Sequence, residues 1–233
     1  MIYTNLLSRI ITELRYELFT AVHKGLRYEL GNISSAASSL NVEDDVSLAE
    51  FTRVFQTLSR VLHSHAEHED SFVQPIVDKL APALSERLEE EHTSTEEILV
   101  GLDDAIAILP QLSKEERQVA WNNWSKNYNR FFAQYLNHLQ TEEVEVMEVL
   151  WQHMTDEELD EVSVKLRSSI PPEEMAVYLS YMLPAMNVYE RVGMLSQMQK
   201  FAPPEAFRGV CELAKNVLAE KDWTELEQGL SIA

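Results

Sequence analysis

Four long stretches of this sequence repeat apolar residues with the period of an α-helix, and this repetition constrains the fold more than any other feature. In each stretch the apolar residues recur at steps of three and four, as they do on a helix that buries one face. The stretches cover roughly residues 5–30, 47–80, 85–109 and 113–153. Only six glycines are present, which also favours long helices over sheets. The sequence therefore predicts an all-α protein built on an antiparallel, up-and-down four-helix bundle.

Local signals mark where several helices begin. A capping box pairs Ser or Thr with a Glu three residues later, and an Asp in place of the Ser or Thr can serve the same purpose. Four such patterns are present, at Ser47/Glu50, Ser113/Glu116, Thr155/Glu158 and Asp222/Glu225. The first two predict the starts of the second and fourth long helices.

Other signals mark helix ends. The first long helix is predicted to end near Gly31, because residues 32–46 are rich in Asn, Ser and Asp and have no helical period. This stretch is predicted to be a long connection. Pro75 is expected to kink or end the last turn of the second helix.

The sequence after residue 153 has a different texture, with shorter helical patterns broken by prolines. No flexible linker precedes this part, so we expect it to pack on the bundle. The sequence thus predicts a bundle over residues 1–153 and a C-terminal helical extension over residues 154–233.

The chain is strongly acidic, with 39 Asp and Glu against 19 Lys and Arg and a formal net charge of −20. Nucleic acids and anionic membranes should be repelled, and metal cations attracted. High acidity alone can also serve only to keep a helical protein in solution. The charge therefore argues against nucleic acids and anionic membranes as partners, but it does not by itself identify a metal site.

Targeting and redox signals are sparse. No apolar run approaches the roughly 20 residues that span a bilayer, and Arg and Glu interrupt the apolar N-terminal stretch, unlike in a secretory signal. We therefore expect a cytoplasmic protein. Cys211 is the only cysteine, which excludes an intramolecular disulfide and a thiolate metal cluster.

Each of the four helical stripes carries one histidine on its apolar face: His23, His65, His92 and His138. The last three are followed four residues later by Glu69, Glu96 and Glu142, respectively. Residues four apart leave the same face of a helix, so each pair can aim at one point in the core. Seven nitrogen and oxygen donors suit iron, manganese or zinc, and are too many for one tetrahedral ion.

Depth and energetics support a metal site at this level of the bundle. Helix lengths allow the four histidines to lie at about the same height. Burying three glutamates among aromatic and aliphatic side chains without a cation would cost several kcal/mol each. By contrast, His63, His68 and His153 fall off the stripes and are interpreted as surface histidines.

Several segments resemble a known family. The segments HAEHEDSFVQP (residues 65–75) and HLQTEE (residues 138–143) are similar to the HxxxEE signatures of hemerythrin-like, cation-binding HHE domains. The elements VHKGLR and EEEH stand where that family places its remaining histidines. The resemblance covers roughly residues 5–153. It implies a non-haem, carboxylate-bridged centre of two iron ions.

The same resemblance assigns a role to each ligand. It makes Glu69 and Glu142 the bridging carboxylates. His23 and His65 would bind one iron, and His92 and His138 the other. Glu96 departs from the oxygen-carrying hemerythrins, which have a histidine at that place. As a ligand, Glu96 would add negative charge, favour the ferric state and weaken the case for reversible oxygen carriage.

Three functional hypotheses follow. In the first, the centre binds or senses oxygen, nitric oxide, peroxide or iron itself. In the second, it is an oxygen- or peroxide-activating enzyme, which a substrate-sized apolar pocket near Tyr135 and Phe55 would favour. In the third, the chain is a structural or adaptor protein with a vestigial metal site. Whether it is an enzyme stays open.

The extension carries five methionines that suit either a core or an adaptable binding surface. They are Met175, Met182, Met186, Met194 and Met198. Ordinary core packing is the favoured interpretation. Binding of a protein partner, or of a second copy of the chain, through these C-terminal helices is the alternative.

Overall fold

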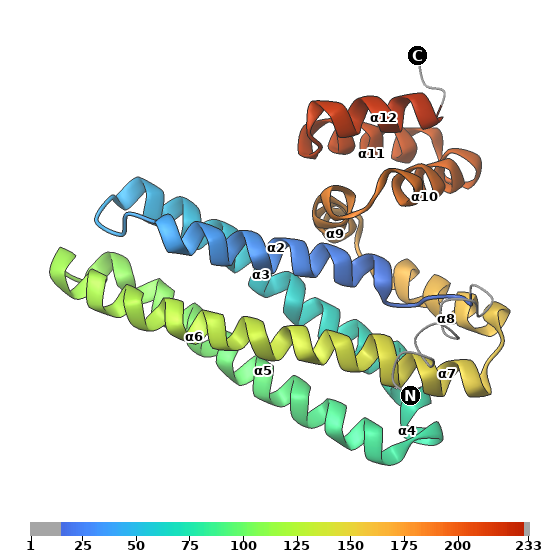
Figure 1. Ribbon diagram of the computed structural model, residues 1–233, viewed down its shortest axis with the longest axis horizontal. Coiled ribbons are helices and arrows are strands. Elements are labelled where there is room, and N and C mark those ends of the chain that lie inside the picture. Colours follow the sequence, from blue (N-terminus) through green and yellow to red (C-terminus); the bar gives the residue numbers. More distant parts are fainter. Residues whose placement is uncertain (1–14, 231–233) are drawn as a thin grey trace, which may run out of the picture.

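A computed structural model describes residues 15–230, which are almost entirely helical and contain no strand. The four longest helices are α2 (Thr20–Ser39), α3 (Asp45–Phe72), α5 (Pro82–Ile108) and α6 (Lys114–Thr141). They lie side by side and successive helices run in opposite directions (Figure 1). Helices α2 and α5 each pack against both α3 and α6. The prediction of an all-α protein is confirmed.

Shorter elements complete this part of the chain. Around the bundle these are α4 (Gln74–Leu80), the 3₁₀ turn η1 (Leu109–Gln111), the π-helical turn η2 (Glu142–Val146) and α7 (Met147–His153). The extension holds α8 (Asp156–Ser169), α9 (Pro172–Ala185), α10 (Val188–Phe201), α11 (Pro204–Val217) and α12 (Glu220–Leu230).

The first long helix differs from its prediction. Helix α2 runs through Gly31 and ends only at Ser39, and the predicted start near residue 5 lies outside the described residues. The predicted long connection is wrong because Ile33 and Ala37 continue the buried stripe, while the polar residues Asn32, Ser35 and Ser38 are exposed. The true connection to α3 is the short segment 40–44.

Helix starts follow the capping signals in part. Ser113 with Glu116 and Thr155 with Glu158 form the predicted capping boxes. Helix α3, however, is capped by Asp44, which accepts the backbone N–H of Ser47. Ser47 therefore lies inside the first turn of α3.

The predicted box at Asp222 and Glu225 is wrong. Helix α12 already begins at Glu220, and Asp222 accepts a hydrogen bond of 3.0 Å from Arg191. A box that the sequence analysis missed, Asn187 with Glu190, caps α10. The effect expected of Pro75 is confirmed, because α3 ends at Phe72 and Pro75 lies in the first turn of α4.

The bundle interior consists of two apolar clusters at different heights. The larger one stacks aromatic rings, with Trp124 in edge or face contact with Phe51, Phe55 and Tyr128. The smaller one gathers residues from α4, α5, η2, α7 and α8 near Phe19. On every long helix the predicted ligands lie between residues of the first cluster and residues of the second. A polar layer thus separates two apolar ones.

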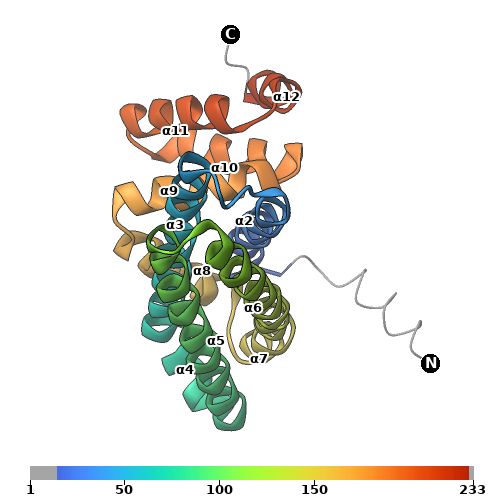
Figure 2. The same ribbon diagram turned by 90° about the vertical axis from the view of Figure 1, so that its left-hand side faces the viewer.

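The extension packs on the bundle, as predicted. Helix α9 crosses α2 steeply, and α10, α11 and α12 gather beyond it on the same side of the bundle (Figures 1 and 2). At this crossing a Cβ atom on Gly25 would lie 2.9 Å from the backbone nitrogen of Met182, so the two helices approach this closely only because residue 25 is a glycine. Helix α8 contacts α3.

No helix among residues 15–230 combines the length and the apolar character that crossing a lipid bilayer would require.

Candidate metal centre

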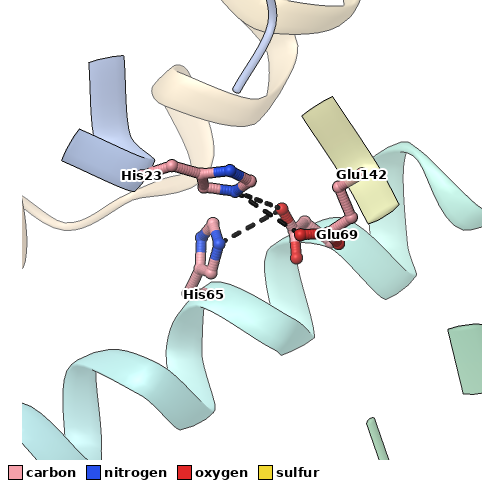
Figure 3. A group of neighbouring side chains, drawn as sticks. All are labelled: His23, His65, Glu69 and Glu142. Carbon is pink, nitrogen blue, oxygen red and sulfur yellow. Dashed lines mark ion pairs between the residues drawn. The ribbon is translucent and has the colours of Figure 1, made fainter. Parts of the chain in front are cut away.

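Six of the seven predicted ligands converge in the polar layer of the bundle. They form two groups of four, and within each group the potential ligand atoms lie within 4.8 Å of one another. One group consists of His23, His65, Glu69 and Glu142, and Figure 3 shows these side chains pointing toward one another. The other consists of Glu69, His92, His138 and Glu142. The two glutamates therefore belong to both groups.

The Nε2 atoms of all four histidines face the two shared carboxylates. His65 Nε2 lies 3.2 Å from Glu69 Oε1, and His138 Nε2 lies 3.3 Å from Glu142 Oε1. His23 Nε2 lies 3.6 Å from Glu69 Oε1 and 3.5 Å from Glu142 Oε2. His92 Nε2 is slightly farther, at 3.9 Å from Glu69 and 3.8 Å from Glu142.

The convergent atoms are buried and poorly satisfied. His23 has no exposed surface, and both carboxylates are almost fully buried. Within the described chain, no hydrogen-bond partner reaches the Nε2 atoms of His23 and His65, either oxygen of Glu69, or Oε2 of Glu142. A buried polar atom without a partner costs about 1–3 kcal/mol. Donors of this type, aimed at common points, fit metal cations.

Three of the histidines are oriented by a carboxylate on the opposite ring nitrogen. The Nδ1 atoms of His23, His92 and His138 lie 3.1, 3.0 and 3.0 Å from Glu143, Asp70 and Glu91, respectively. A carboxylate accepts a hydrogen bond from Nδ1–H, and in the neutral ring this leaves Nε2 with a lone pair that faces the centre. This arrangement is the common outer shell of metal-binding histidines.

Two contacts reinforce this interpretation. Arg27 donates two hydrogen bonds, of 2.7 and 2.8 Å, to Glu143 and so fixes the carboxylate that orients His23. The Nε2 atoms of His92 and His138 are only 3.0 Å apart. A proton on one of the two atoms makes this contact a hydrogen bond, whereas two lone pairs would repel each other, and a bound cation would take the place of that proton.

The sequence analysis missed these orienting carboxylates, although a signal was present. Each stands next to a ligand: Asp70 after Glu69, Glu91 before His92, and Glu143 after Glu142. A neighbouring residue on a helix points about 100° away from the ligand, toward the adjacent helix. Asp70 on α3 therefore reaches α5, Glu91 on α5 reaches α6, and Glu143 in η2 reaches α2.

The electrostatics of the two shared carboxylates differ. Burial, and then the neighbouring Glu142, raise the pKa of Glu69 well above its usual value. Burial would also raise the pKa of Glu142, but His138 and His92 outweigh it and hold that pKa well below its usual value. Burial lowers the pKa of His65. For His138, burial is outweighed by Glu142 and Glu91, which raise its pKa to about 9. Without a cation, a proton therefore binds more readily to Glu69 than to Glu142.

Glu96 does not join the centre. Its side chain is 66% exposed, and its carboxylate lies 3.9 Å from Nδ1 of His63 on the neighbouring helix. The reason is the phase of the buried stripe of α5, which alternates steps of four and three through Leu88, His92, Thr95 and Leu99. The step after His92 is three, so Thr95 and not Glu96 turns inward. The prediction of Glu96 as a ligand therefore has no support in the geometry.

The alternation of steps of three and four also explains why the other two pairs, His65/Glu69 and His138/Glu142, point inward. On α3 the step before His65 is three, from Leu62, so the next inward position is Glu69. On α6 the step before His138 is three, from Tyr135, which places Glu142 inward. The helix then opens into the π-helical turn η2, which begins at Glu142 itself. Such turns occur often at functional sites.

Two cavities border the centre on different sides. An apolar pocket of about 710 Å³ includes His65 and Glu69 in its wall. A groove of about 560 Å³ between α5 and α6 includes His138 and Glu91. The space around Tyr135 and Phe55 is instead filled by the aromatic core. Neither of the two cavities has Tyr135 or Phe55 in its wall, the place where a pocket would have favoured an enzyme.

The remaining histidines lie outside both groups. His153 is exposed at the end of α7, and His63 is partly exposed beside Glu96. His68 is half-buried, because its Nδ1 bonds to the backbone oxygen of Ser64 at 2.6 Å and its side chain lines the apolar pocket.

Comparison with known proteins adds one finding. Residues 14–162 match the family model described as hemerythrin HHE cation binding domain. The match includes all six convergent side chains and ends within α8. No curated protein and no solved structure shows significant similarity to the chain.

Proposed function

Because the chain belongs to the hemerythrin HHE cation-binding domain family, we propose that its six convergent side chains hold two iron ions as a centre that binds or senses a small diatomic or peroxidic ligand. The observation that carries this proposal is the pair of overlapping donor groups, in which five buried atoms have no hydrogen-bond partner in the described structure. Glu69 and Glu142 would bridge the ions, His23 and His65 would complete one site, and His92 and His138 the other.

The donor set supports the choice of metal. Imidazole nitrogens combined with carboxylate oxygens suit iron, and manganese or zinc would also fit. Two bridging carboxylates and four neutral imidazoles leave a pair of divalent cations with net positive charge, which the outer carboxylates Asp70, Glu91 and Glu143 offset.

The geometry also supports a small ligand. Each ion would have four protein donors, which leaves room for a further ligand on an ion that prefers a larger coordination number. Bound iron would supply the redox chemistry that oxygen, nitric oxide or peroxide requires. The groove beside His138, lined by polar side chains such as Gln134 and Asn137, is wide enough for small polar molecules.

Metal analysis of protein purified without added metal tests the proposal. We expect about two iron ions per chain and the near-ultraviolet absorption of a ferric centre. His65→Ala should lose most of this iron, whereas His63→Ala, on the same helix but outside the cluster, should keep it. Full iron occupancy in His65→Ala, or absence of iron from the natural chain, would refute the assignment.

Small-ligand binding needs a separate test. Addition of nitric oxide to the reduced, iron-loaded protein should change its optical spectrum with a saturable dependence on concentration. A spectrum that nitric oxide leaves unchanged would point away from binding or sensing of diatomic ligands, even if the iron is present.

A second candidate function is activation of oxygen or peroxide for oxidation of an organic substrate. It is favoured by one observation, the apolar pocket that has two of the proposed ligands, His65 and Glu69, in its wall. Consumption of oxygen that rises when an apolar compound is added would support this candidate over simple ligand binding. A cytoplasmic location and a partner or second copy bound through the C-terminal helices remain parts of the proposal.

A further inference from the structure

The apolar pocket lies between the bundle and the extension. Its walls come from the N-terminal part of α2, from α3, and from α8, α9 and α10, which meet at this corner of the molecule (Figure 1). Its volume of about 710 Å³ is within the range of small-molecule sites, roughly 300–1,000 Å³. The close crossing of α2 and α9 at Gly25 and Met182 holds one side of it in place.

Methionine is frequent in the lining. Five of the six methionines of the extension line this pocket, namely Met175, Met182, Met186, Met194 and Met198. Methionine side chains are flexible and polarisable, and proteins use them where a surface must adapt to apolar ligands of different shapes. Met182 also packs against the apolar core of the bundle, and Met175 and Met194 pack against the apolar cluster of the extension, so core packing and the pocket wall share these side chains.

The charges around the pocket exclude a strongly charged ligand. Lys24 forms an ion pair with Glu190, and Arg167 lies 3.9 Å from Asp160. The basic groups of the lining thus already face acidic partners. The acidic groups Glu17 and Glu69 remain in the wall, and the chain as a whole is negative. An anion would be repelled, and the largely apolar wall would not compensate a cation for lost hydration.

From these observations we propose that the pocket binds an uncharged, apolar organic molecule, with one end against His65 and Glu69. Binding depends on the pocket alone, and only the contact with a metal rests on the function proposed above. The C-terminal helices would then have a role in the site, because α8, α9 and α10 supply most of the wall.

A fluorescence titration with N-phenyl-1-naphthylamine, a neutral apolar dye, tests the proposal on the full chain. We expect saturable binding of one dye per chain in metal-free protein. Met194→Trp should fill the pocket and weaken binding at least about tenfold, whereas the volume-conserving Met194→Leu should bind nearly as well as the natural chain. If circular dichroism shows that Met194→Trp does not fold, Met198→Trp, in the last turn of α10, is tested in its place.

Two controls separate binding inside the pocket from adsorption on the protein surface. Phe201, on the same helix, is 82% exposed and could adsorb dye, so Phe201→Ser should leave binding unchanged. The anionic dye 1-anilinonaphthalene-8-sulfonate should bind more weakly than the neutral one. Loss of binding in Phe201→Ser, unchanged binding in Met194→Trp, or tighter binding of the anionic dye would overturn the proposal.

The iron-loaded protein tests the contact with the metal. Iron close to the pocket should quench the fluorescence of the bound dye, and the reloaded natural chain should show this while His65→Ala should not. Equal fluorescence with and without bound iron would overturn the contact. This outcome can be told apart from loss of the metal site itself, because the iron content of the same samples shows whether iron is bound.

Discussion

Replacing Glu69 by leucine should stabilise the metal-free protein and abolish its response to metal. Glu69 is buried, and neither of its oxygens has a hydrogen-bond partner in the described structure. At about 1–3 kcal/mol for each unpartnered atom, this carboxyl costs the fold roughly 2–6 kcal/mol. Leucine has a similar size and no polar atoms. Part of the gain is lost because His65, 3.2 Å away, loses its neighbour.

Replacement of a whole buried ion pair by well-packed apolar groups is neutral or stabilising by up to about 4 kcal/mol. Glu69→Leu comes close to this case, because burial lowers the pKa of His65 and raises that of Glu69, so the change leaves no opposite charge without its partner. For a chain of this length, 1 kcal/mol corresponds to roughly 2–4 °C in Tm. We therefore expect the Tm of chelator-treated Glu69→Leu to exceed that of the chelator-treated natural chain by roughly 3–10 °C. Addition of iron should raise the Tm of the natural chain and leave that of the variant unchanged.

Thermal unfolding followed by circular dichroism measures both effects. Glu67→Leu is the matched control, since Glu67 is exposed on the same helix and should affect neither the metal-free Tm nor the response to iron. A metal-free Glu69→Leu protein less stable than the natural chain would show that the carboxyl stabilises the fold even without a cation. A variant that iron still stabilises would show that Glu69 does not bridge the ions.

Three further changes probe the surroundings of the centre. Glu96→His should leave iron content and the rate of air oxidation unchanged, because the side chain points away from the cluster; a changed rate in stopped-flow mixing would return it to the site. Glu91→Ala should weaken metal affinity about 10–100-fold in chelator competition, because His138 loses the carboxylate on its Nδ1. Gly25→Ala should lower the stability of the chain by about 1–3 kcal/mol in urea unfolding, since the new methyl group meets the backbone of Met182; an unchanged midpoint would contradict the close crossing.

The sequence predicts well which histidines and glutamates converge in the bundle, Glu96 excepted, and predicts their surroundings poorly, for a physical reason. His65 with Glu69 is a local pattern, because two residues on one helix keep their relative direction whatever the helix packs against. Glu96 has the same spacing from its histidine and still points outward, which only the alternating steps of the whole stripe of α5 reveal. A ligand should therefore be judged against the full stripe and not against one neighbour.

Features that depend on how helices dock are harder to predict. The contact of Glu143 with His23 depends on how α6 and η2 are rotated relative to α2. That rotation cannot be deduced from the sequence of either segment alone. The apolar pocket depends on the crossing at Gly25, where a helix more than 150 residues later in the chain lies against α2. The helical period assigns Met182 and Met194 correctly to an inward face, but it cannot tell whether that face meets a core or a cavity.

The two cavities make the competing functions separable by mutation. The groove on the His138 side has polar residues in its wall, and the pocket on the His65 side is larger and apolar, so small diatomic ligands and larger apolar molecules would reach one centre by different routes. Ala133→Trp should obstruct the groove, because Ala133 lines it and is exposed. We expect this change to slow the association of nitric oxide with the reduced iron-loaded protein in stopped-flow mixing, while Met194→Trp leaves that rate unaltered and removes only binding of the apolar dye. If Met194→Trp slows nitric oxide and Ala133→Trp does not, the apolar pocket is the entrance for both, and a binder of diatomic ligands could no longer be distinguished from an enzyme by its access routes alone.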